Sequence, residues 1–238
     1  MEEHVRSALK RGLPVSARCP AHDNIMSVAG GGPSLADTYS GLTGVIVSCN
    51  KSLSFLLDRD ITPWACGVMD PGEHMADLIE PRRDVFYFLA SVCHPRTFDK
   101  LTNAGCQVIL WHALGLPTLE VILNDMRPGN WSAVGGGTTI GLRWVNLGYS
   151  MGFRTFHLHG VDSSYRKGER YAYSAEGAPA YHTMTVDGFL TSPNLMGQVE
   201  DFQSLLKMYS QPDIEPTTIE VFGDGLLPHW YRKHKEKA

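Results

Sequence analysis

Short hydrophobic runs recur along the chain and are separated by segments with helical periodicity. The runs of strand length lie at 25–29, 44–50, 64–69, 84–90, 107–112 and 155–161. After the second run, Leu53, Leu56 and Leu57 fall on one face of a predicted helix over 51–60, with Ser52 as its N-cap. Alternation of apolar strands with helices is typical of βαβ units. We therefore expect an α/β fold with a Rossmann-like, mostly parallel sheet flanked by helices.

The clearest helical pattern follows a second glycine run. Its apolar positions are Ile140, Trp144, Leu147, Gly148 and Met151. Spacings of three and four residues place them on one side of a helix, and Gly152 suits the position after its last turn. A second helix is predicted over 94–104, ended by Gly105, and a short one over 119–123.

The last part of the chain has a different pattern. Residues 166–180 are polar and rich in tyrosine, which predicts a mobile loop. After them we expect a hairpin over 181–191 that turns at Asp187-Gly188, and then a helix over 194–209. A strand over 217–222 and a frayed basic end over 229–238 are predicted to follow. The chain is thus predicted to be one globular unit. Residues 1–23 are predicted to be a peripheral N-terminal segment, and residues 24–165 a nucleotide-binding core. Residues 166–238 are predicted to be a C-terminal extension of loop, hairpin and helix.

The stretch IMSVAGGGPSL at 25–35 is the first candidate site, because a buried strand runs there into a glycine turn and a helix start. Gly30, Gly31 and Gly32 leave the backbone open to a ligand, and Pro33 suits a first helical position. The free N–H groups at such a helix start, together with Ser34, predict a phosphate-binding site. The stretch is neither a Walker A loop nor a GxGxxG fingerprint, so a tight turn without a ligand is the alternative.

Other polar residues directly follow predicted strands. Asn50 suits the edge of a sugar or a base, because its side chain both donates and accepts hydrogen bonds. Asp70 and Asp162 are predicted to lie on the same rim, since ligands of parallel sheets bind at the carboxyl ends of the strands. Two such carboxylates suit a magnesium ion on a polyphosphate, and Asp162 is also a catalytic candidate. Each carboxylate capping a following turn is the alternative.

The second glycine run and the histidines add further candidates. Gly136, Gly137, Thr138 and Thr139 open the helix that follows them, where the other half of a ligand is expected. His182 follows the tyrosine-rich loop and is our candidate general acid or base, because a group there can close over a bound ligand. A surface hairpin histidine is the alternative.

Composition narrows the range of functions. The 238 residues are 43% hydrophobic and 19% charged, as in ordinary soluble domains, and the net charge of -4 argues against non-specific nucleic-acid binding. The sequence shows no apolar run near the roughly 20 residues of a membrane span and no secretory signal at its N-terminus. The 5 cysteines are scattered through apolar runs, which predicts reduced thiols and a cytoplasmic location. We expect small-molecule partners, and a homo-oligomer is left open.

Three motifs together resemble a known family. VAGGGPSL, the stretch VIVSCNKSLSFLLDRDITPWACGVMDP, and the stretch VGGGTTIGLRWVNLGYSMGFRTFHLHGVDSSY are similar to the 6-hydroxymethylpterin diphosphokinase MptE-like family, which shares domains with the Maf flagellin glycosyltransferases. The resemblance runs from Ile25 to Tyr165. It implies a Rossmann-like fold and a nucleotide-dependent transferase. In that transferase ATP gives its pyrophosphoryl group to a pterin hydroxymethyl group, with Mg²⁺ neutralising the phosphates.

The first segment also resembles the bacterial lipooligosaccharide sialyltransferases, which open with a strand, G-N-G-P-S-L, and a second strand ending in Cys-Asn. Pro33, Ser34 and Asn50 match that pattern, while Gly31 stands where those enzymes have Asn. This resemblance implies a nucleotide-sugar donor of the CMP-sialic-acid kind, with His182 as the base and loop tyrosines on the donor phosphate. A nucleotide-binding protein without catalysis is the third hypothesis.

Overall fold

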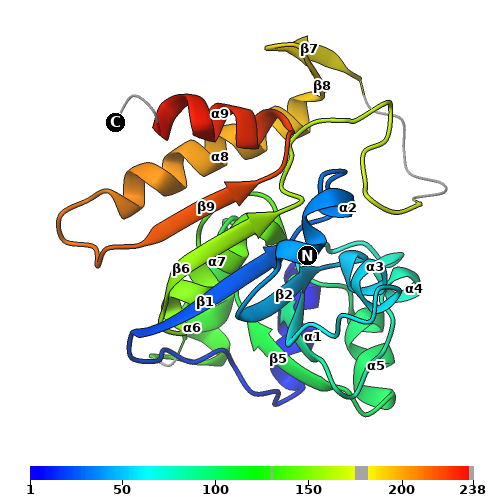
Figure 1. Ribbon diagram of the computed structural model, residues 1–238. Coiled ribbons are helices and arrows are strands. Elements are labelled where there is room, and N and C mark those ends of the chain that lie inside the picture. Colours follow the sequence, from blue (N-terminus) through cyan, green and yellow to red (C-terminus); the bar gives the residue numbers. More distant parts are fainter. Residues whose placement is uncertain (130, 175–181, 236–238) are drawn as a thin grey trace.

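The fold is built on one seven-stranded parallel sheet (Figure 1). The computed structural model describes residues 1–129, 131–174 and 182–235. The strands of the sheet are β1 (His22–Ala29), β2 (Val45–Cys49), β3 (Ala65–Val68), β4 (Phe86–Ala90), β5 (Gln107–Trp111), β6 (Phe153–His159) and β9 (Thr218–Phe222). Their order is β5-β4-β3-β2-β1-β6-β9, and every neighbouring pair is parallel. The predicted α/β class is confirmed.

The strand order reverses between β1 and β6. Strands β2 to β5 follow one another on one side of β1, whereas β6 and β9 lie on its other side. Ser27 pairs with His157 and Ala29 with His159, so both strands end at the same level. The crevice at the carboxyl ends of two strands that diverge in this way is where open α/β sheets bind ligands.

Helices connect the strands and cover both faces of the sheet. They are α1 (Glu2–Lys10), α2 (Leu35–Thr38), the 3₁₀ turn η1 (Tyr39–Gly41), α3 (Ser52–Leu57), α4 (Met75–Leu78), α5 (Pro95–Asn103), α6 (Leu119–Met126), α7 (Ile140–Ser150), α8 (Pro193–Tyr209) and α9 (Leu226–Lys235). Helix α7 packs on one face, where buried Trp144 donates from Nε1 to the Ser48 carbonyl oxygen at 3.0 Å. On the other face, Leu35, Phe55 and Leu56 form a smaller core with Ala29.

The C-terminal extension contributes to the sheet instead of being appended to it. Strand β9 pairs with β6 over five positions, and Figure 1 shows α8 and α9 packed together beside it. The hairpin of β7 (Met184–Val186) and β8 (Phe189–Thr191) turns at Asp187 and Gly188, as predicted, with both residues at positive φ.

Three local predictions are wrong. Helix α2 begins at Leu35 and not at Pro33, because the glycine turn continues through Ser34. Ser52 is not the N-cap of α3. Its hydroxyl donates to the Ala29 carbonyl oxygen at 2.7 Å and so ties the ends of β1 and β2 together. Residues 229–235 belong to helix α9 instead of a frayed segment, since Leu226, Leu227 and Tyr231 of that helix are buried against the sheet and α8, and residues 236–238 lie outside the described chain.

The described helices include none that is long and apolar enough to cross a membrane. All five cysteines are free thiols. Burial of the Cys49, Cys66 and Cys93 thiols raises their pKa, so they stay protonated, as expected of core cysteines. The cytoplasmic location and the lack of a nucleic-acid partner stay predictions.

We predict that Gly148→Ala weakens the contact between α7 and the sheet. A Cβ at Gly148 would lie 2.6 Å from Phe156 Cε1 and 2.8 Å from Met26 Sδ, so neighbouring core side chains must shift. Overpacking of this kind costs about 1–3 kcal/mol of unfolding free energy. Chemical denaturation measures it, and Gly197→Ala on α8 is the matched control.

Gly197 has no atom within 4 Å of its ideal Cβ. Its replacement by alanine should therefore raise stability by up to ~1 kcal/mol through helix propensity. Equal stability changes in the two variants would contradict close packing at Gly148.

Candidate functional site

A cavity of about 420 Å³ lies at the carboxyl ends of β1, β2, β3 and β6. Its lining brings together most of the residues predicted from sequence, namely Gly30, Gly31, Gly32, Asn50, Asp70, Thr138, Thr139 and Asp162. Each strand thus delivers its following residues to one place, as expected of a parallel sheet. Pro33 and Ser34 do not line the cavity, and Gly136 and Gly137 line a second cavity behind it.

The first glycine turn has few open amides. Gly30 N donates to the His159 carbonyl oxygen and Gly32 N to the Gly160 carbonyl oxygen, both at 2.7 Å. The expectation of a row of free N–H groups at residues 30–34 is therefore wrong. Within the described chain, only the amide of Gly31 lacks a hydrogen-bond partner in this turn, since Pro33 has no N–H. The turn forms a close backbone wall of the cavity.

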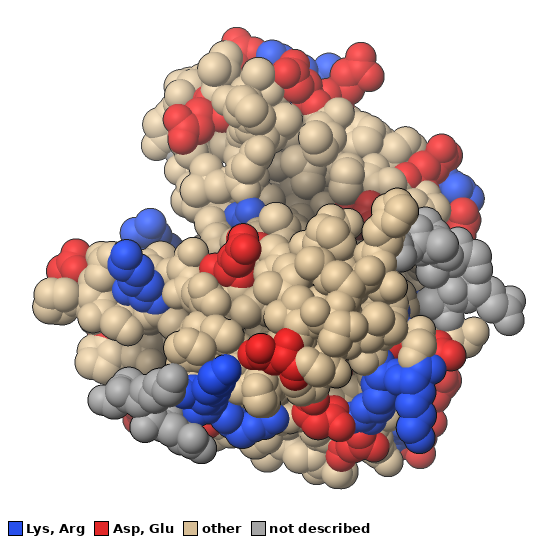
Figure 2. Space-filling model, turned by 90° about the horizontal axis from the view of Figure 1, so that it is seen from above, with Lys and Arg blue, Asp and Glu red and all other residues tan. Residues whose placement is uncertain are grey.

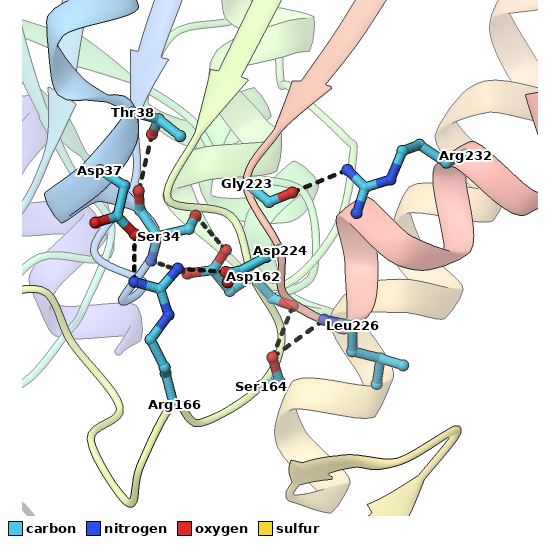
Figure 3. Close-up of polar contacts among 10 residues, drawn as sticks. All are labelled: Ser34, Asp37, Thr38, Asp162, Ser164, Arg166, Gly223, Asp224, Leu226 and Arg232. Carbon is cyan, nitrogen blue, oxygen red and sulfur yellow. Dashed lines mark hydrogen bonds and ion pairs between the residues drawn. The ribbon is translucent and has the colours of Figure 1, made fainter.

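Asp162 occupies the start of α2 in place of an external anion. Ser34 N donates to Asp162 Oδ2 at 2.7 Å, and Ser34 Oγ donates to Asp162 Oδ1 (Figure 3). The carboxylate is 3% exposed. Burial raises its pKa, while the two Ser34 hydrogen bonds and nearby Arg166 oppose that rise. Asp162 thus joins β6 to the turn after β1, and its partner Ser34 precedes it by 128 residues instead of lying in a following turn.

Arg166 extends this joint at the protein surface. Its guanidinium forms ion pairs with Asp37 on α2 and with Asp224, which follows β9 (Figure 3). The hydroxyl of Ser164 accepts a hydrogen bond from Leu226 N at 3.1 Å, and Leu226 is the first residue of α9. The segment after β6 is therefore tied to both neighbouring strand ends.

The start of α7 is the open helix terminus of the cavity. Thr139 is its N-cap, and its hydroxyl accepts from Leu142 N at 3.5 Å. No partner among the described residues accepts from the amides of Ile140 and Gly141, which line the cavity. Such amides and the positive end of an 11-residue helix favour a phosphate group there. The second glycine run, and not the first, thus supplies the open helix start.

Asn50 lines the same cavity and has a side-chain acceptor without a partner among the described residues. The residue has a positive φ of 51°, which the end of β2 imposes, and its Oδ1 atom is buried without a partner in the described structure. Buried polar atoms normally have partners, so this oxygen suits a donor group of a ligand, such as a hydroxyl or an exocyclic amine.

The two candidate metal ligands fit a magnesium ion unequally. Asp70 is half-exposed, with Oδ1 accepting from Gly72 N at 2.7 Å and Oδ2 lying 3.8 Å from His74 Nε2. Both Asp162 oxygens accept from Ser34. The described residues contain no group of three or more side chains that could hold a metal. Asp70 alone fits an ion that is bound chiefly by substrate phosphates and water, as magnesium commonly is.

A tyrosine-containing segment, residues 170–174, covers the first glycine turn and is called the strap. Ala172 N donates to the Gly31 carbonyl oxygen at 3.0 Å, and Lys51 Nζ donates to the Ser174 carbonyl oxygen at 2.9 Å. The rings of Tyr171 and Tyr173 stack with centroids 5.3 Å apart, and both line the cavity. Burial raises the pKa of Tyr173, so its hydroxyl stays protonated. The segment 175–181 of the predicted loop lies outside the described residues.

The histidines lie away from the cavity. His182 is exposed and does not contribute to the described lining, so its acid–base role stays a prediction. His157 and His159 share a face of β6, because they alternate along the strand, and His159 is 1% exposed and stacks on Phe222. Burial lowers the pKa of His159 to about 4.

The sequence patterns missed Gln198 and Leu195, which reach the cavity from α8, and Arg170 from the strap. A helix was predicted over 194–209, but nothing in its periodicity indicated that its first turn would face the glycine turns. Asp201 on the same helix accepts from both Thr138 N and Thr138 Oγ1 at 2.8 Å, another contact between distant segments.

Comparison with known proteins agrees with this geometry. The family model described as 6-hydroxymethylpterin diphosphokinase MptE-like matches residues 15–168. A MAf glycosyltransferase from Magnetospirillum magneticum AMB-1 has a similar fold, with a TM-score of 0.66 and 15% identity. The match covers 99% of this chain and 41% of that chain. No curated protein matches. The resemblance to MptE-like and Maf proteins is confirmed, whereas no comparison shows the one to sialyltransferases.

We predict that Asp162→Ala destabilises the fold, because it leaves the buried amide and hydroxyl of Ser34 without acceptors. The expected loss of unfolding free energy is about 2–4 kcal/mol. Asp162→Asn should lose less, since its amide retains one acceptor. Asp84→Ala, which removes an exposed ion pair with Arg82, is the control and should cost under ~1 kcal/mol. Similar small losses of unfolding free energy in all three variants would contradict a stabilising contact between Asp162 and Ser34.

We predict that His159 makes stability fall in acid. Its folded pKa of about 4 lies below the ordinary value of 6.5, so the unfolded chain takes up a proton first as the pH falls. Stability is then lost as pH decreases from about 6.5 towards 4. Between pH 7 and pH 5, His159→Phe should lose about 1–2 kcal/mol less than the wild type. Parallel pH profiles of unfolding free energy would contradict burial of a neutral imidazole.

Proposed function

Because this chain belongs to the 6-hydroxymethylpterin diphosphokinase MptE-like family, a family of transferases, we propose that it transfers the pyrophosphoryl group of ATP to the hydroxymethyl group of a pterin-type acceptor. The observation that carries the proposal is the open start of α7, which faces Asn50 and Asp70 across one cavity at the strand-order reversal. A polyphosphate needs such a combination of free amides, close backbone and neutralising partners.

The phosphates of the donor lie against the amides of Ile140 and Gly141 in this proposal. Residues 30–32 form another part of the wall, where the lack of side chains leaves room for the turn after β6 and for Tyr173. The buried Oδ1 of Asn50 accepts from the nucleoside. Asp70 would hold magnesium, which neutralises phosphate charge when bound.

The transfer itself is a displacement at the β-phosphorus. The acceptor hydroxymethyl oxygen forms a bond to that phosphorus, and the bond from it to the oxygen bridging the α-phosphate breaks. AMP leaves with the bridging oxygen, and the hydroxyl proton passes to solvent or to a base, for which His182 and Asp162 are the candidates. Positioning of the two reactants supplies most of the rate in such reactions.

A second candidate function is glycosyl transfer from a nucleotide sugar. Two observations favour it: the fold of a MAf glycosyltransferase covers 99% of this chain, and the Tyr171 and Tyr173 rings lie over Gly31 in the cavity. In this case the tyrosine hydroxyls donate to the donor phosphate, and His182 deprotonates the acceptor hydroxyl.

The two functions differ in donor and in metal dependence. Thermal-shift measurements with ATP, CMP and CMP-sugars, each with and without magnesium, separate them. A magnesium-dependent shift with ATP, with AMP release on addition of 6-hydroxymethylpterin, supports the diphosphokinase. A metal-independent shift with cytidine nucleotides supports the glycosyltransferase. Donor binding without product formation from any acceptor supports a non-catalytic nucleotide-binding protein and contradicts both.

We predict that Gly141→Val abolishes donor binding while the fold survives. An ideal Cβ at Gly141 meets its nearest atoms at 3.7 and 3.9 Å, so the protein has room, whereas the new methyl groups cover the open amides of α7. Donor affinity should fall at least about tenfold by calorimetry, a loss of 1.4 kcal/mol.

Gly197→Val is the matched control. It places the same side chain on α8 with no atom within 4 Å of its Cβ and should leave donor affinity unchanged. A folded Gly141→Val variant with wild-type affinity would show that the phosphates bind elsewhere.

A further inference from the structure

A second cavity of about 830 Å³ lies on the far side of the second glycine run. It is lined by α7, α8, the end of β5 and the N-terminal segment before β1. Val15 pairs in parallel with Leu110, and Ser16 N donates to the Leu110 carbonyl oxygen at 2.9 Å. The N-terminal segment, predicted to be peripheral, therefore forms a wall of this cavity.

Two polar side chains of the cavity lining have unsatisfied hydrogen-bonding atoms. His112, which follows β5 and is 2% exposed, has no partner for Nδ1 among the described residues, and Ser16 has none for Oγ. Burial lowers the pKa of His112 to about 4, so the imidazole is uncharged at neutral pH. It then offers one donor and one acceptor. Buried atoms of this kind normally find partners in the protein, in water or in a ligand.

Aromatic rings and charged side chains of both signs complete the lining. Trp111, Tyr149 and Tyr209 contribute rings. The Arg154 guanidinium lies 3.9 Å from the centre of the Tyr149 ring and donates from Nε to Glu215 at 2.7 Å. The charged residues of the lining carry both signs, and Arg154 and Glu215 pair with each other, so the cavity has no large excess of one sign that would select a strongly charged ligand. It suits a flat, neutral molecule with a hydrogen-bonding edge.

The second glycine run is a thin wall between the two cavities. Gly136 and Gly137 have φ of 102° and 93°, and an ideal Cβ at Gly136 would lie 2.1 Å from Asn146 Nδ2. The buried Arg143 guanidinium donates to the carbonyl oxygens of Val134 and Gly137 from inside the protein. The next residue, Thr138, lines the first cavity and is held by Asp201, which lines the second.

We propose that this second cavity binds an uncharged aromatic heterocycle of the nucleobase kind and that its occupancy further restrains the loop 135–139. The site is distinct from the donor cavity, and the inference holds whichever donor the first cavity takes. Because the same loop ends at the open start of α7, the ligand acts as a regulator of the donor site.

The binding test uses 2-aminopurine, an uncharged fluorescent heterocycle that aromatic stacking quenches. Wild-type protein should quench it saturably. Ser204→Trp, at an exposed position of α8 that lines the cavity, fills the space and should weaken binding by about tenfold or more. Val121→Trp is the matched control. Val121 is 67% exposed on α6 and lines neither cavity, so this variant should bind as the wild type does.

Hydrogen exchange gives the second readout. Saturating 2-aminopurine should slow amide exchange in residues 135–139 of the wild type and leave it unchanged in Ser204→Trp. No saturable quenching, equal quenching by Ser204→Trp, or unprotected loop amides would overturn the proposal. Quenching lost in Gly141→Val but kept in Ser204→Trp would place the heterocycle in the first cavity, which also overturns it. If neither ATP nor CMP binds, the proposed donor of the first cavity is contradicted, and the proposal for the second cavity is not.

Discussion

The buried carboxylate of Asp162 at the strand-order reversal is the contact on which the site depends. Transfer of a carboxylate from water into a protein interior is costly unless hydrogen bonds compensate it, and here Ser34 supplies two. The backbones of the β1 and β6 turns also touch. A Cβ on Gly30 would lie 2.3 Å from the Gly160 carbonyl oxygen, and one on Gly32 would lie 2.5 Å from Asp162 Oδ2. The glycines of the first turn thus serve chain packing at least as much as ligand approach.

The contact between Asp162 and Ser34 determines which helix start is free to bind an anion. The start of α2 receives its negative charge from Asp162, whereas the start of α7 keeps two amides open toward the cavity. The two helix termini therefore have different tasks, one structural and one available for a ligand. On the face drawn in Figure 2, blue and red side chains are interspersed and in several places lie side by side. In the proposed function, the local helix terminus and not an extended field of one sign would select the anionic donor.

Local patterns predicted the sheet and the position of the site well. The runs ending before Gly30, Asn50, Asp70 and Asp162 are all parallel strands, and the rule for parallel sheets placed these residues in one cavity. Hydrogen-bond partners that lie far apart in the chain could not be predicted from local sequence patterns. Ser34 and Asp162 are 128 residues apart, and Thr138 and Asp201 are 63 apart, so no periodicity links them. The segment 229–238 was predicted to be a frayed surface end because the charges of the last turn of α9 mask the one buried aromatic residue there, Tyr231.

Backbone amide chemical shifts distinguish the two helix starts as anion sites, because they report on the N–H groups themselves. In ¹⁵N-labelled protein titrated with ATP–magnesium or with CMP, the account predicts that the largest shifts occur at Gly31, Ile140 and Gly141, while Ser34 keeps its shift because Asp162 remains bound to it. Large shifts at Ser34 with none at the start of α7 would contradict this assignment and would place the anion at the start of α2.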